Sequence, residues 1–277
     1  MEANRKKDGR PRIMVFGAHP DDPDLSAGGF ALRHVKLGHK VRFVSLTNGD
    51  AGHHRIGGVE LAERRKRETE NVEKLTGIEY QVCDISDGKL TPSLENRETV
   101  IRAIRKFEPD LVLAPRPNDY HPDHRYASRL VQDSMYMVTV PNICPLTPHL
   151  RYNPVAAYVE DNFQRPYPFS PDFVLPIDDV IEEKLDIVHC HKSQVYEWLP
   201  YNGNYEGQVP EKEGKRRDWL ADVRKPRMKE TAEKFRERLV EAYGKQRGEE
   251  VEYAEAFELC EYGGELSEDM EEDLFHI

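Results

Sequence analysis

Short apolar runs alternate with segments of helical periodicity along the first two thirds of the chain. The runs consist of β-forming residues and end at glycine, proline or polar turns, which predicts buried strands. They lie at Ile13–Phe16, Lys40–Leu46, Glu79–Cys83, Leu111–Ala114, Val155–Val159 and Phe173–Ile177. Between them, apolar residues recur every three or four positions, which predicts helices after Asp24 and over Val59–Leu75, Glu95–Phe107, Tyr126–Tyr136 and Glu182–Val195. This alternation predicts an α/β fold: a Rossmann-like, mostly parallel sheet with helices on both faces.

The two ends of the chain carry a different pattern. Residues 1–11 are charged and predict a flexible N-terminal arm, and residues 263–277 predict an acidic C-terminal tail that we expect to be mobile over Glu265–Asp273. Residues 12–262 contain no internal repeat and no convincing boundary, so we expect a single domain there. Within it, the periodicity of Arg224–Tyr243 predicts a helix, and the glycine- and charge-rich segment Tyr201–Arg217 predicts a loop that is a candidate lid.

Composition narrows the classes of function. The chain has 277 residues, of which 38% are hydrophobic, and a net charge of −11. It can therefore build a sizeable core, but it is too acidic for a general nucleic-acid or anionic-membrane surface. No apolar run approaches the ~18–20 residues that span a bilayer, and no signal-peptide core follows the basic start. The four cysteines are scattered without a CxxC pair, so we expect free thiols and a cytoplasmic location. A homo-oligomer is compatible with this composition.

Two polar clusters follow two of the predicted strands. His19-Pro-Asp-Asp22 follows the first strand, and Asp119-Tyr-His-Pro-Asp-His124 follows Leu111–Ala114. Each cluster alone is compatible with a polar turn at a helix start. In one parallel sheet, however, both clusters would meet at the carboxyl edge, where open α/β sheets hold their ligands. Together they predict a metal site, because Zn²⁺ accepts both imidazole nitrogen and carboxylate oxygen.

A catalytic metal site uses three protein ligands and leaves a further position for water. His19, Asp22 and His124 supply a set of two histidines and one carboxylate. Asp21 is then free to take a proton from the bound water, whose pKa a metal lowers to ~7. His121 is placed to stabilise an oxyanion or to protonate a leaving amine. These donors do not separate zinc from Fe²⁺ or Mn²⁺.

The same residues carry a resemblance to a known family. Ala18-His-Pro-Asp-Asp22 with Gly28-Gly29, followed by His121-Pro-Asp-His124, resembles the PIG-L/LmbE family of zinc-dependent N-deacetylases. Members of that family remove acetyl groups from N-acetylglucosaminyl phosphatidylinositol, from mycothiol and bacillithiol precursors and from chitobiose-like sugars. Further matching segments are Leu46–Gly52, Arg65 with Glu68, Asp87-Gly88, His191-Lys-Ser-Gln194 and Tyr253–Phe257. The resemblance covers residues 12–195 and the last of these segments.

The resemblance implies the same zinc ligands and Asp21 as the general base. It implies that His121 is the electrophile or acid and that Asp123 orients it. It also assigns Arg65 and Asp87 to the hydroxyl groups of the substrate.

The chain departs from the family pattern at two positions, and the partner of a third residue, Arg65, stays open. One residue is inserted before the acid Asp24, as in the bacillithiol-type branch of the family. Asp119 stands where some members carry a substrate tyrosine, and we expect the adjacent Tyr120 to point differently, so no tyrosine is assigned. Arg65 has an alternative partner in Glu68 on its own helix.

The resemblance implies a metal-dependent hydrolase that removes the acetyl group from an N-acetylated amino sugar. The alternatives are an amidase that acts on another amide, such as a thiol conjugate, and a non-catalytic sugar-binding α/β protein. The first strand-turn lacks G-x-G-x-x-G, which argues against dinucleotide binding. The chain also has no adjacent His-Asp dipeptide, which a phosphohydrolase of the paired His-Asp type would need.

Overall fold

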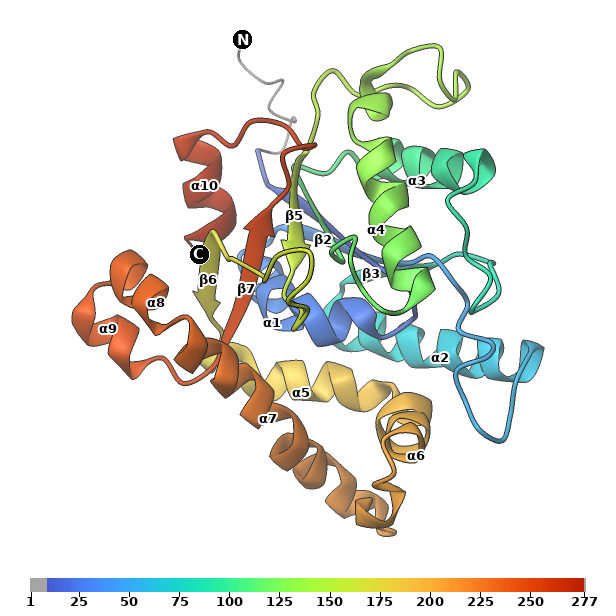
Figure 1. The fold of residues 1–277 in the computed structure, drawn as a ribbon, viewed down its shortest axis with the longest axis vertical. Coiled ribbons are helices and arrows are strands. Elements are labelled where there is room, and N and C mark those ends of the chain that lie inside the picture. Colours follow the sequence, from blue (N-terminus) through green and yellow to red (C-terminus); the bar gives the residue numbers. More distant parts are fainter. Residues whose placement is uncertain (1–8, 277) are drawn as a thin grey trace.

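Seven strands form one sheet at the centre of the molecule (Figure 1). The computed structural model describes residues 9–276. The strands are β1 (Arg12–Gly17), β2 (Lys40–Ser45), β3 (Glu79–Val82), β4 (Leu111–Ala114), β5 (Val155–Val159), β6 (Phe173–Pro176) and β7 (Ala254–Leu259), in the spatial order β3-β2-β1-β4-β5-β7-β6. Neighbours from β3 to β5 are parallel, and β7 is antiparallel to both β5 and β6. The predicted mostly parallel α/β sheet is confirmed.

Helices cover both faces of this sheet, because alternate residues of a strand point to opposite sides. From β1, Met14 and Phe16 pack with α3 (Leu94–Phe107) and α4 (Pro122–Ser134). Ile13 and Val15 point the other way, toward α1 (Asp22–Lys36) and α10 (Glu268–Phe275). The other α-helices of the described residues are α2 (Val59–Thr76), α5 (Ile181–Cys190), α6 (Leu199–Asn202), α7 (Arg216–Lys234), α8 (Arg236–Tyr243) and α9 (Lys245–Glu250).

Some element boundaries differ from the prediction. Helix α4 begins at Pro122, four residues before the predicted start, because proline fits the first helical turn and His121 caps it. The predicted helix over Arg224–Tyr243 is divided between α7 and α8 at Phe235, whose φ of −111° and ψ of 28° are not helical. The hydrophobic pattern did not predict β7, because Glu255 interrupts its apolar run.

Within the predicted acidic tail over 263–277, the segment 265–273 that was expected to be mobile lies mostly in α10, which spans residues 268–275. Leu274 and Phe275 are each only 1% exposed. The ring of Phe275 stacks on that of Phe173 in β6, with the centroids 4.0 Å apart. The acidic composition of this segment concealed two apolar residues that anchor it to the sheet.

Other predictions about the periphery have mixed outcomes. Of the predicted arm over residues 1–11, residues 1–8 lie outside the described part of the chain, and β1 begins at Arg12. The candidate lid over Tyr201–Arg217 contains two short 3₁₀ turns before α7 begins, and its movement stays a prediction. Among residues 9–276, no helix is both long and apolar enough to cross a bilayer.

Helix α1 is interrupted just beyond its first turn, and strand β7 supports the interruption. Ala27 has a φ of −139° and a ψ of 20°, so the helix starts anew there. Glu255 acts as a cap from outside the helix: its Oε1 accepts a hydrogen bond from the backbone N–H of Gly29 (2.9 Å), and its Oε2 accepts one from Phe30 (2.7 Å). Lys184 of α5 forms an ion pair with Glu255, and both side chains are almost fully buried.

Close packing at this interruption explains the Gly28-Gly29 motif. A Cβ atom at Gly28 would lie 2.9 Å from Cδ1 of Ile187, and one at Gly29 would lie 2.7 Å from Cγ2 of Ile177. Neither position admits a side chain unless its neighbour moves. The two glycines therefore let α1 approach α5 and the residue after β6.

Glu255→Ala is expected to lower the free energy of unfolding by about 3–5 kcal/mol, because Lys184 would stay buried without its partner. Two backbone N–H groups would lose their acceptor as well. Urea denaturation followed by circular dichroism measures the change. Glu252→Ala is the matched control: that side chain is 52% exposed, so its loss should cost at most about 1 kcal/mol. Equal costs for the two variants would contradict the capping role of Glu255.

Candidate metal centre

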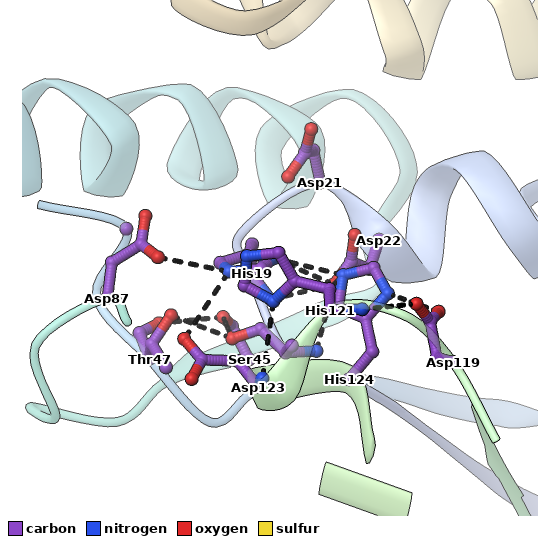
Figure 2. Close-up of polar contacts among 12 residues, drawn as sticks. His19, Asp21, Asp22, Ser45, Thr47, Asp87, Asp119, His121, Asp123 and His124 are labelled. Atoms are coloured by element: carbon purple, nitrogen blue, oxygen red, sulfur yellow. Dashed lines mark hydrogen bonds and ion pairs between the residues drawn. The ribbon is translucent and has the colours of Figure 1, made fainter. Parts of the chain in front are cut away.

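Two loops at the carboxyl edge of the sheet bring both polar clusters together (Figure 2). Strands β1 and β4 are adjacent and parallel, so they end at the same edge. His19 and Asp22 lie in the turn from β1 into α1, where Oδ2 of Asp22 accepts hydrogen bonds from the backbone N–H groups of Ala18 (2.9 Å) and His19 (2.8 Å). His121 and His124 lie at the start of α4, just beyond β4. The structure thus brings the two predicted clusters into contact.

The three predicted ligand atoms converge on one point. Nδ1 of His19 lies 3.2 Å from Nε2 of His124. Oδ2 of Asp22 lies 3.4 Å from the first of these nitrogens and 3.3 Å from the second. In a tetrahedral zinc site with bonds of about 2.0–2.1 Å, ligand atoms lie about 3.3 Å apart. The three side chains therefore fit one tetrahedral divalent ion and leave its fourth position open.

Carboxylates hold the outer nitrogens of both histidines. Nε2 of His19 lies 3.1 Å from Oδ1 of Asp87, and Nδ1 of His124 lies 2.8 Å from Oδ2 of Asp119. Histidines that bind metals usually donate their second ring N–H to a carboxylate in this way. The inner nitrogens then present lone pairs to each other and to the carboxylate of Asp22. Three atoms with lone pairs repel one another at these distances unless a cation lies among them. The chemistry of the three ligand atoms therefore also fits a metal.

Two other groups place potential ligand atoms within 4.8 Å of one another. They are His19, His121 and His124, and His19, Asp87 and Asp123. The second group would bind through Nε2 of His19, whose distances to Oδ1 of Asp87 (3.1 Å) and Oδ2 of Asp123 (3.6 Å) differ more than those of the set with Asp22. The first would replace Asp22 by His121, whose Nε2 would be the ligand atom because its Nδ1 is engaged by the backbone. We favour the set that includes Asp22, because its three separations match a tetrahedral ion.

The ring of His121 is held by the backbone of its own helix. Its Nδ1 accepts a hydrogen bond from the N–H of Asp123 at 3.2 Å, so a neutral ring carries its proton on Nε2. The carboxylate of Asp123 instead accepts a hydrogen bond from the N–H of Gly88 (2.6 Å) and lies 3.6 Å from Nε2 of His19. The backbone of Asp123 therefore orients His121, and a role for its carboxylate in that orientation stays a prediction.

Arg65 is engaged by the predicted general base. Its guanidinium is almost fully buried, and Nη2 donates a hydrogen bond to Oδ1 of Asp21 at 2.6 Å. Glu68, the alternative partner, accepts hydrogen bonds from the N–H (2.8 Å) and Oγ (2.7 Å) of Ser193 instead. The predicted contacts of Arg65 and Asp87 with substrate hydroxyls stay predictions.

Charges within the cluster compensate one another. Burial opposes the charged form of His19, but hydrogen bonds to Asp123 and Asp22 outweigh this effect and raise its pKa. Burial likewise opposes ionisation of Asp22, yet the charge of His124 and the contact with His19 hold its pKa well below the usual range. For His121, burial and the charge of His19 both lower the pKa. Its ring is therefore favoured in the neutral form, with an N–H to donate.

Comparisons with known proteins bear on the whole domain. Residues 14–135 match the family described as GlcNAc-PI de-N-acetylase, PIG-L. The diacetylchitobiose deacetylase of Thermococcus kodakarensis is 31% identical over 207 residues, which cover 69% of this chain and 74% of the relative. The chain belongs to the PIG-L family. The resemblance carried by the two sequence clusters is thereby confirmed.

Solved structures share the fold of this PIG-L protein. The N,N'-diacetylchitobiose deacetylase of Pyrococcus horikoshii has a TM-score of 0.70 at 22% identity, with coverage of 94% of this chain and 88% of that one. The protein TT1542 of Thermus thermophilus has a TM-score of 0.66 at 24% identity, covering 88% and 92%. GalB of Pseudomonas putida, a 4-carboxy-2-hydroxymuconate hydratase, has a TM-score of 0.68 at 18% identity, covering 90% and 96%. At these identities the likeness shows the fold alone.

The supporting roles of two residues in this PIG-L site were not predicted. Asp119 holds His124, and Ser193 holds Glu68 on α2 beside Arg65. The position of Asp119, five residues before a candidate ligand, is a signal that the sequence offers, because ligating histidines need an acceptor. Ser193 lies far from α2 in the sequence, and its partner could not be deduced from spacing.

Arg65→Met is expected to lower kcat about tenfold or more while the metal content stays unchanged, because Asp21 would lose its buried hydrogen-bond donor. The loss should be similar for an N-acetyl sugar and for a minimal acetamide without hydroxyl groups. Steady-state kinetics on both substrates, with elemental analysis, measure this. Arg64→Met on the same helix is the matched control, since Arg64 pairs with Glu197 instead. A loss confined to the sugar would assign Arg65 to substrate hydroxyls and not to Asp21.

Proposed function

We propose that this PIG-L protein is a metal-dependent N-deacetylase that acts on an N-acetylglucosamine-type sugar or glycoside, with zinc as the metal. The observation that carries the proposal is the triangle of His19 Nδ1, Asp22 Oδ2 and His124 Nε2, with sides of 3.2–3.4 Å. A non-catalytic sugar-binding protein would not need three converging metal ligands, nor the Asp21 carboxylate that Arg65 holds beside them. The name of the Thermococcus relative supports the class of substrate.

The proposed chemistry divides between the metal and the side chains around it. A metal held by His19, Asp22 and His124 would lower the pKa of a water molecule to about 7 and would polarise the acetamide carbonyl. Asp21 takes the proton of the attacking water while the new C–O bond forms. Arg65 fixes the Asp21 carboxylate during this transfer.

The remaining steps need a donor for the oxyanion and a proton for the leaving group. His121 donates its Nε2–H to the oxyanion. This fits the hydrogen bond at Nδ1, which accepts from the backbone and therefore carries no proton in the neutral ring. The C–N bond then breaks, and the leaving nitrogen takes up a proton through Asp21 or His121. The second proton of the water passes to the released amine, so the products are acetate and the protonated amino sugar, and atoms and charge balance.

The test is acetate release from a panel of N-acetylated substrates, together with metal analysis of the purified protein. We expect release from N-acetylglucosamine or N,N'-diacetylchitobiose, its loss after chelation and its recovery with zinc. Release only from an acetylated thiol conjugate would redirect the proposal to another amide. Sugar binding without acetate release from the metal-loaded protein would overturn the hydrolase proposal. Iron or manganese in the purified protein would replace zinc.

A further inference from the structure

An exposed aromatic surface lies beside the candidate metal centre. Tyr120 directly precedes His121, and its side chain is 76% exposed. The Tyr120 and His121 rings lie 6.2 Å apart between centroids, and the His121 ring lies 4.9 Å from that of His19. On its other side, Tyr120 lies 5.9 Å from the ring of Phe163. A continuous series of ring contacts therefore leads from the metal centre to Phe163.

Phe163 lies in the loop after β5, residues 160–172, which forms one wall of this surface and is held in place by buried contacts. The loop after β5 lies beside the loop between β4 and α4 (Figure 1). Arg116, only 1% exposed, joins the two loops: it donates hydrogen bonds to Oδ1 of Asp161 at 3.0 Å and to the carbonyl of Tyr167 at 2.8 Å. Its guanidinium also lies 4.8 Å from the centre of the Tyr167 ring. A buried arginine with these contacts fixes the wall in place before any ligand arrives.

The chemistry of this surface suits a sugar ring. A pyranose presents C–H groups on its faces and hydroxyl groups around its rim. Tyrosine combines an apolar ring with a polar tip, which suits such a ligand, and small-molecule sites are commonly lined by aromatic groups with a few polar ones. The half-buried Phe163 offers apolar area beside the exposed ring of Tyr120.

We propose that Tyr120 and Phe163 form a subsite for the second ring of an N-acetylated disaccharide whose first ring is deacetylated at the metal centre. This inference rests on the proposed function and adds to it the residues that select a disaccharide over a monosaccharide. Tyr120 follows Asp119, which supports His124, and precedes His121. A sugar ring that extends from the metal centre past His121 would meet Tyr120, whose ring lies 6.2 Å from that of His121.

The first measurement is the ratio of kcat/KM for N,N'-diacetylchitobiose to that for N-acetylglucosamine. Tyr120→Ala and Phe163→Ala should each lower this ratio about five- to tenfold, mainly through KM for the disaccharide. Tyr120→Trp should restore most of the ratio, because it keeps an aromatic face. Tyr136→Ala is the matched control: Tyr136 is 70% exposed but lies beyond the far end of α4, and its loss should leave the ratio unchanged.

The second measurement is binding without turnover. Calorimetric titration of Asp21→Asn protein with N,N'-diacetylchitobiose should give a Kd that Tyr120→Ala weakens about five- to tenfold. An equal Kd with and without Tyr120, or no binding at all, would overturn the subsite. Failure of the wild-type protein to release acetate from either sugar would overturn the proposed function instead, so the two failures are distinguishable.

Discussion

Asp21→Asn is expected to retain its metal and to lose about 10²–10⁴-fold in kcat, the usual cost of removing a general base. The amide cannot take the proton of the attacking water. Its oxygen can still accept the hydrogen bond that Nη2 of Arg65 donates to Oδ1 of Asp21, so the local arrangement should persist. Elemental analysis and steady-state acetate release measure the two quantities on one preparation.

The control for this variant is Asp84→Asn, which changes an exposed carboxylate just beyond β3. It should have wild-type kcat and metal content. A wild-type kcat in Asp21→Asn would mean that another group, or the metal alone, activates the water. Loss of metal from Asp21→Asn would instead place Asp21 among the groups that hold the ion.

His124→Ala is expected to lose most of its metal on dialysis, and activity with it. The substitution removes one corner of the triangle of ligand atoms and leaves two donors, His19 and Asp22, where a catalytic zinc site uses three. Asp119→Asn should have a smaller effect, about 10–100-fold in metal affinity, because it removes only the carboxylate behind the ring. Competition with a chromogenic chelator measures both affinities.

His149→Ala controls for the loss of a histidine, because His149 lies in the loop beyond the 3₁₀ helix Tyr136–Thr139 and outside all three candidate ligand groups. Full metal occupancy in His124→Ala would remove His124 from the ligand set. Occupancy that falls in His121→Ala but not in Asp22→Ala would favour the group of three histidines.

Local signals predicted the part of the fold on which the metal centre depends. Strands β1 and β4 each contain a short apolar run, and the side chains that follow them must meet if the strands are neighbours. The placement of His19, Asp22 and His124 therefore followed from the order of strands and turns. The strongest support for this ligand set is that its three ligand atoms lie about 3.3 Å from one another. These distances could not be deduced from the sequence.

What the sequence did not predict depends on partners far away in the chain. The spacing on α2 offered Glu68 as a partner for Arg65, whereas burial brought Asp21 within reach. The charge of residues 263–277 predicted an acidic tail. Nothing in the neighbouring sequence indicates that the ring of Phe275 packs on that of Phe173. A charged residue is expected at the protein surface unless its buried partner is known. For this reason the hydrophobic pattern also failed to predict β7, which contains the buried Glu255.

The cap that Glu255 supplies to α1 has a consequence for the order of events during synthesis. Its partners, the N–H groups of Gly29 and Phe30, precede it by 226 and 225 residues. At about 5–20 residues per second, the ribosome adds β7 roughly 5–19 s after β5. Through that interval the nascent chain holds both halves of the metal centre, while the helix that presents Asp22 lacks its cap and β5 has an unpaired edge. Stable metal uptake should therefore wait until β7 has joined the sheet, and the half-made sheet is the stage at which chaperones would have an edge to protect.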